Sequence, residues 1–178
     1  MKHTLVALVE DRPGVLSRVI TLFRRRNFNI ESISVGHTET PDISRMTLVV
    51  DGSKTQVEQV TKQLYKVINV RKVSDVTEDA TLDRELALIK VSAKATTRSE
   101  ILQMVEIYRA KVLDVAPSSI TIEITGQESK VDSLVGLLKG YGIKEMVRTG
   151  KVSMVRGSTA TRETTGAPTS NGNGNGKH

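Results

Sequence analysis

The residues best suited to bind a small molecule lie in segment 10–16, Glu-Asp-Arg-Pro-Gly-Val-Leu, which joins an apolar run to a helical pattern. A helix N-terminus presents unpaired N–H groups and a partial positive charge, and both favour a carboxylate or phosphate. Gly14 would let a ligand approach the backbone closely. The Asp11 carboxylate could pair with an ammonium group, and the amide of Asn29 could both donate and accept. Such a set suits an amino acid, but the segment equally suits a plain turn and helix cap.

No segment has the spacing of a familiar catalytic motif. The chain lacks a Gly-x-Ser-x-Gly nucleophile elbow and the glycine-rich phosphate-binding loops. It has no cysteine, and its three histidines, His3, His37 and His178, lie far apart, so we expect no metal site. His37, beside Glu39 in a polar hairpin, has the setting of a solvated residue. The sequence therefore favours a non-catalytic binding or regulatory module that carries no cofactor of its own.

Composition and charge argue against several further classes. No apolar run reaches the roughly 20 residues that cross a bilayer, and acidic residues in the first apolar stretch argue against a signal peptide. Without thiols, a cytoplasmic protein is expected. The formal charge is +6, but only 3% of residues are aromatic, and the one basic cluster, 24–26, suits a solvated helix end. We expect neither a membrane nor a nucleic acid as partner.

The hydrophobic pattern around segment 10–16 predicts the order strand, helix, strand, strand, helix, strand. From Val15 the apolar residues have helical spacing until Asn27. A capping-box pattern at 55–58 opens the second helix. The expected strands are 3–9, 29–35, 44–51 and 68–73.

The second half of the chain repeats this order. Segment 44–52 aligns with 118–126 at an offset of 74 residues (118 − 44), and the capping-box pattern recurs at 129–132. A strand over 86–91 and a helix capped by Thr97 begin the second copy. The repeat predicts an α+β protein of two βαββαβ domains. These are residues 1–76 and 83–156, with a linker at 77–82 and a Gly- and Asn-rich tail at 157–178 that we expect to be disordered.

Two features predict that these domains do not stand alone. Units of about 75 residues bury little surface by themselves. The run 5–9 is apolar at consecutive positions, whereas a strand with one wet face alternates. We therefore expect the second face or the edge of the sheet to be covered, and we expect the chain to form oligomers.

Several spaced segments together resemble the regulatory small subunits of acetolactate synthase, also called acetohydroxyacid synthase. These segments are Val9–Val19, Phe28–Ser32, Ser44–Thr47 and Arg84–Val91. The resemblance extends over about residues 2–156 and implies an N-terminal ACT domain of ferredoxin-like topology, followed by an ACT-like domain. At the turn that corresponds to segment 10–16, the second copy has Ser-Ala-Lys-Ala-Thr (92–96) with neither proline nor glycine. We therefore expect an effector in the first domain only.

The resemblance also implies a function in the synthesis of valine, leucine and isoleucine. Such subunits bind a separate catalytic subunit, a transferase with thiamine diphosphate, magnesium and FAD that makes acetolactate or acetohydroxybutyrate. They raise its activity and confer feedback inhibition, usually by valine. Two ACT domains pair side by side in a homodimer, with the effector at their interface. The matching positions are Asp11, Gly14 and Val15 of one chain with Asn29 and Ile30 of its neighbour; many relatives carry asparagine in place of Asp11.

Two other functions share this order of elements. RNA-recognition modules place aromatic residues on their central strands, but runs 5–9 and 45–50 have none. A stand-alone amino-acid sensor for another enzyme or a transporter is the second alternative. Co-purification without a thiamine-dependent partner would favour the sensor, and salt-dependent retention on RNA would favour the first alternative.

Overall fold

The computed structural model describes residues 1–157. The predicted tail, apart from Gly157, lies outside the described residues. The first unit consists of β1 (Lys2–Glu10), α1 (Val15–Arg25), β2 (Asn29–His37), β3 (Ile43–Asp51), α2 (Lys54–Leu64) and β4 (Val70–Asp75). The second consists of β5 (Thr81–Ser92), α3 (Arg98–Ile107), β6 (Lys111–Ala116), β7 (Ser119–Gly126), α4 (Glu128–Leu138), a short 3-10 turn (Lys139–Tyr141), β8 (Ile143–Arg148) and β9 (Val152–Val155).

Both units have the same sheet topology. The first sheet has the order β2-β3-β1-β4, and the second has the order β6-β7-β5-β8, with β9 paired to the early part of β5. Neighbouring strands are antiparallel. The predicted α+β fold of two ferredoxin-like βαββαβ units is confirmed. Among residues 1–157, no helix is long and apolar enough to cross a membrane.

Each unit has its own hydrophobic core between its helices and one face of its sheet. In the first core, alternate residues of β1 contact Val15, Val19 and Phe23 of α1, all buried. Phe23 also meets Phe28 edge to face, with ring centroids 6.0 Å apart. The second core is built around the isoleucines of β7, the buried face of β5 and the apolar sides of α3 and α4. Because the two cores are separate, each helical pattern in the sequence finds its apolar partner within its own unit.

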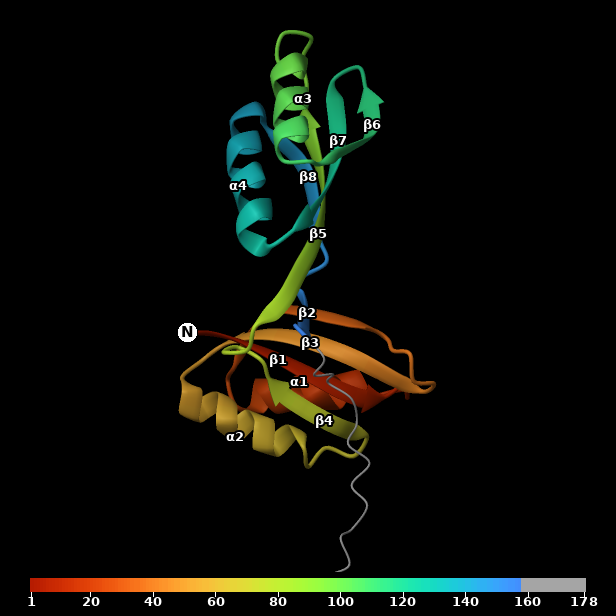
Figure 1. The fold of residues 1–178 in the computed structure, drawn as a ribbon, viewed down its shortest axis with the longest axis vertical. Helices are drawn as coiled ribbons and strands as arrows, with labels where there is room; N and C mark the ends of the chain where they lie inside the picture. The colour runs from red at the N-terminus through yellow and green to blue at the C-terminus, as the bar shows by residue number, and fades with distance from the viewer. Residues whose placement is uncertain (158–178) are drawn as a thin grey trace, which may run out of the picture.

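The second face of the first sheet is covered by the same chain. Its residues Thr4, Val6 and Val49 are at most 6% exposed, and the structure lying over them is a two-stranded ribbon made of residues 81–84 of β5 and 152–155 of β9. Figure 1 shows this ribbon on the side of the sheet opposite α1 and α2. The expected covering is therefore confirmed, but it needs no second copy of the chain.

Two side chains fasten the ribbon to the first sheet. Arg45 Nη2 of β3 donates to the carbonyl oxygen of Ser153 at 2.6 Å. Lys151 Nζ donates to Thr4 Oγ1, also at 2.6 Å. The ribbon begins inside the predicted linker 77–82, since β5 already starts at Thr81. The connection between the units is therefore partly a strand.

The helix caps agree only in part with the predicted ones. The capping box of α2 is formed by Ser53 and Gln56: Ser53 Oγ accepts from the Gln56 N–H, and Gln56 Oε1 accepts from the Ser53 N–H. The prediction of Thr55 was wrong by two residues, because Thr55 and Glu58 have the same spacing. The predicted cap at 129–132 is also wrong, because α4 begins after Gln127 without a side-chain cap. Thr97 is the N-cap residue of α3, as predicted, but its hydroxyl forms hydrogen bonds with the Lys94 backbone and not with the helix.

Candidate functional site

The turn between β1 and α1 leaves the start of the helix open. Gly14 precedes the helix with φ 84° and ψ −8°, in the left-handed region that glycine adopts without strain. No side chain caps α1, and a Cβ built on Gly14 would meet no atom within 4 Å. The Val15 N–H donates to the Arg12 carbonyl oxygen at 3.3 Å, but no side chain caps the N–H groups that follow it in the first turn, so a ligand carboxylate could bind there.

The Asp11 carboxylate lies beside this turn and is held by the hairpin between β2 and β3. The Asp11 N–H donates to the Asp42 carbonyl oxygen at 2.7 Å. Asp11 Oδ2 lies 3.2 Å from Nδ1 of His37, the last residue of β2. The sequence indicated only a solvated His37 and gave no signal for this contact, because the two residues meet only once β2 and β3 have paired. About half of the Asp11 side chain remains exposed.

The neighbouring carboxylate, Glu10, is already occupied. Asn69 donates to it, and Arg71 and Arg12 pair with it. The hydrogen bond from Asn69 and the charges of the two arginines hold the pKa of Glu10 below its usual value, although partial desolvation opposes them. Of these two carboxylates at the turn, Asp11 is thus the one with room for an ammonium group.

Val15 contributes its backbone to the turn but not its side chain. The residue is 2% exposed, and its side chain belongs to the first core with Val19 and Phe23. The structure therefore brings Asp11, Gly14 and Val15 together at one place, but Val15 is buried and its N–H donates to the Arg12 carbonyl oxygen at 3.3 Å.

Asn29 and Ile30 lie at the opposite end of the same sheet. In β3, Ile43 pairs with Glu10, next to the turn, whereas Asp51 pairs with Asn29. The nine residues of β3 separate these two points, which is roughly 25 Å at about 3.3 Å per residue. Within one chain, therefore, Asn29 and Ile30 do not join the turn.

The corresponding turn of the second unit is built differently. It has no glycine, and the Thr97 hydroxyl accepts from the Lys94 N–H at 3.1 Å. Arg98 Nη2 donates to the carbonyl oxygens of Ala116 and Pro117, each at 3.0 Å, which ties this helix start to the next hairpin. The geometry that suits a ligand is thus found in the first unit.

A cleft of about 370 Å³ also lies between the two units. It is lined by Glu31, Ser32, Ile33, Val49, Glu85, Glu128, Arg148, Thr149, Gly150 and Lys151. Its charged groups largely satisfy one another: Lys2 bridges Glu31 at 2.8 Å and Glu128 at 3.5 Å, and Arg148 pairs with the buried Glu85. Across residues 1–157, no three side chains are grouped as metal ligands. The cleft is therefore a less suitable site for a ligand than the turn between β1 and α1.

Comparison with known proteins gives matches over both units. Residues 5–72 match the model of the AHAS small subunit-like ACT domain, and residues 84–157 match the model described as the small subunit of acetolactate synthase. The acetolactate synthase small subunits of Mycobacterium leprae and Mycolicibacterium smegmatis are each 54% identical over 155 residues, which is 87% of this chain and 92% and 91% of theirs. The crystal structure of the acetolactate synthase small subunit from Thermotoga maritima superposes with a TM-score of 0.82 at 42% identity, covering 89% of this chain and 99% of that one.

Proposed function

Because this chain belongs to the family of acetolactate synthase small subunits, we propose that it binds the catalytic subunit, raises its activity and makes it subject to feedback inhibition by valine. The chain is the regulatory member of the enzyme. In this proposal, thiamine diphosphate, magnesium and FAD belong to the catalytic subunit. The product of that subunit enters branched-chain amino acid synthesis.

The separation of Asp11 from Asn29 within one chain is the observation that supports an effector site between two chains. The strand β2 runs from Asn29 to His37, has Ile33 at its centre and lies at the edge of the sheet. A second copy related by a two-fold axis through Ile33 would set its own Asn29 against His37, which touches Asp11. The two halves of the site, which lie apart in one chain, would then come together in a homodimer, and the dimer would contain two such sites.

Exposed apolar residues beside this edge support the same dimer. Val35 of β2 is 47% exposed, and Leu16 and Ile20, one turn apart on α1, are 41% and 40% exposed. Helix α1 contacts β2, so these side chains lie along the side that a second copy would cover. Their burial between two copies would supply part of the hydrophobic free energy of dimerisation.

The chemistry of the turn fits an α-amino acid. Its carboxylate would accept from the first-turn N–H groups of α1, its ammonium would pair with Asp11, and Asn29 with Ile30 of the second copy would close the site around an aliphatic side chain. Because the site draws on two chains, effector affinity would depend on the geometry of the dimer. An effector shifts activity only by its preference for one state of the assembly.

The experiment is reconstitution with a catalytic subunit. Acetolactate formation is measured with and without this chain, and then with valine, leucine or isoleucine added. We expect the chain to raise the rate and valine to lower it again. An unchanged rate in all conditions would contradict the proposal, and stimulation without any effect of the amino acids would contradict the effector site alone.

A further inference from the structure

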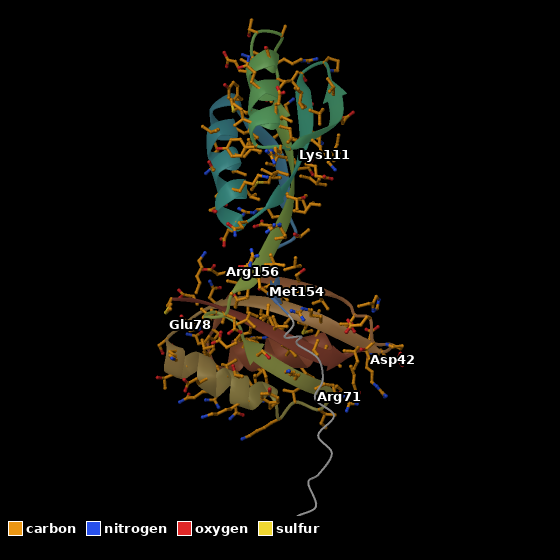
Figure 2. The ribbon with its side chains drawn as sticks, in the orientation of Figure 1. Asp42, Arg71, Glu78, Lys111, Met154 and Arg156 are labelled. Carbon is orange, nitrogen blue, oxygen red and sulfur yellow. The ribbon has the colours of Figure 1, made fainter. Side chains whose placement is uncertain are left out.

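One face of the ribbon over the first sheet is turned away from both cores. Its outward residues are Leu82 and Arg84 on β5, Val152 and Met154 on β9, and Arg156 directly after β9. Leu82 pairs with Met154, and Arg84 pairs with Val152. Leu82 is 39% exposed, Val152 47% and Met154 61%. Figure 2 shows Met154 and Arg156 where the ribbon meets the first unit. The ribbon thus presents an apolar centre to solvent.

The other face of the ribbon is fixed in place. Ser153, between Val152 and Met154, is 4% exposed. Its hydroxyl donates to Asp83 at 2.6 Å, and Lys151 Nζ lies 3.6 Å from the same carboxylate. A two-stranded ribbon is marginally stable alone, but this one rests on a sheet, so its outward residues are held in position.

An arginine stands at each end of the apolar centre. Arg84 Nη1 donates to the carbonyl oxygen of Asp83 at 2.7 Å, and Arg156 Nε donates to that of Thr81 at 3.2 Å. Within the described residues, neither guanidinium contacts a carboxylate. None of the five outward residues is acidic. The face therefore combines apolar contact area with two positive charges that could still pair with a partner.

We propose that this outward face is the docking surface for the catalytic subunit, and that the surface it meets is an apolar patch flanked by carboxylates. The inference rests on the proposed function, which supplies the partner. Met and Arg are both enriched in protein interfaces, and Arg is among the residues that contribute most to the binding energy. A second copy of this chain suits the face less well, because it would bring two further arginines and no acid.

The position of the face also gives the effector a route to the partner. Arg45 pairs across the sheet with Gly36 of the edge strand β2, and its guanidinium holds the carbonyl of Ser153 in the ribbon. A shift of β2 on effector binding would therefore reach the docking surface through one side chain.

The test compares full-length variants for binding to the catalytic subunit. Met154→Glu should weaken the Kd at least tenfold, and the pair Arg84→Glu with Arg156→Glu should weaken it similarly and reduce its salt dependence. Met154→Leu should bind like the wild type. Ile107→Glu, at a 76% exposed position at the end of α3, is the matched control and should not change the Kd.

Effector binding and the thermal unfolding midpoint serve as controls for folding. Both should be unchanged in the Met154 and arginine variants if these variants fold. Unaltered Kd values in those folded variants would overturn the inference, as would a loss of self-association with normal binding of the catalytic subunit, which would assign the face to a second copy. A wild-type chain that does not bind or stimulate the catalytic subunit would instead overturn the proposed function.

Discussion

Asp11 Oδ2 lies 3.2 Å from His37 Nδ1, so the turn that opens α1 is joined to the far end of the strand that begins at Asn29. Each chain therefore has one half of the proposed site at each end of β2. A side-by-side pair would contain two complete sites, and each site would use Asp11 of one chain and Asn29 of the other.

Mixed dimers test this arrangement directly. Asp11→Ala and Asn29→Ala should each abolish effector binding, since each removes one half of both sites. When the two variants are mixed and allowed to exchange, half of the dimers are hybrid, and each hybrid regains one intact site. Calorimetric titration with valine should then recover about one quarter of the wild-type number of sites. No recovery in a mixture shown by mass spectrometry to contain hybrids would mean that the two residues act within one chain.

Gly14 separates the role of the turn in effector binding from its role in folding. Gly14→Asp should abolish feedback inhibition and leave stimulation of the catalytic subunit largely intact, because the added carboxylate would repel and displace that of the ligand. Gly14→Ala is the matched control. It meets no neighbouring atom but must adopt φ near 84°, so it should lower the free energy of unfolding by about 1 kcal/mol. Normal valine inhibition in the aspartate variant would contradict the site.

The sequence predicts the parts of the fold in which neighbours along the chain determine the structure. The apolar spacing from Val15 predicts the start of α1 correctly, because the same residues that make the pattern fill the core. The turn at segment 10–16 is also predicted correctly, because Pro13 and Gly14 determine it locally.

The remaining features depend on pairing between distant segments. The sequence predicts residues 81 and 82 as part of the linker, and Thr81–Arg84 carries two charged residues. This segment is nevertheless a strand, because β9 pairs with it and Ser153 donates a hydrogen bond to Asp83. The contact between Asp11 and His37 likewise exists only after β2, β3 and β1 have taken their register. Register is set when two strands pair and by the turn that joins them, so the spacing of residues within one segment does not reveal which distant residues it will contact.

The corrected cap of α2 gives a prediction about stability. Ser53→Ala removes the acceptor for the Gln56 N–H, and we expect the free energy of unfolding to fall by about 1 kcal/mol. Thr55→Ala, two residues into the helix, should change it by less than about 0.5 kcal/mol in either direction. Urea unfolding followed by circular dichroism measures both values. A larger loss of stability for Thr55→Ala than for Ser53→Ala would show that Thr55 is the capping residue, as the sequence predicts.

Asp83 should make the attachment of the ribbon sensitive to acid. Burial alone would raise the pKa of Asp83, but hydrogen bonds from Ser153 and Thr81 and the charge of Lys151 together hold it below its usual value. With a lowered pKa in the folded state, the ionised carboxylate stabilises the fold above the unfolded pKa of about 3.9. This stability is lost as the pH falls through the folded value.

Asp83→Asn keeps the shape of the side chain and removes its charge. We expect the wild type to exceed this variant in the free energy of unfolding by a constant amount of about 1 kcal/mol between pH 5 and 7, and the difference to shrink below about pH 4. Ser153→Ala removes one hydrogen bond and leaves the charge and the backbone contact with Arg45, so its loss of stability with acid should be smaller than that of the wild type. Urea unfolding between pH 3 and 7 measures all three. If the gap between wild type and Asp83→Asn stays the same down to pH 3, the ionised carboxylate does not hold the ribbon, and the contacts of Arg45 and Lys151 with the first unit must do so alone.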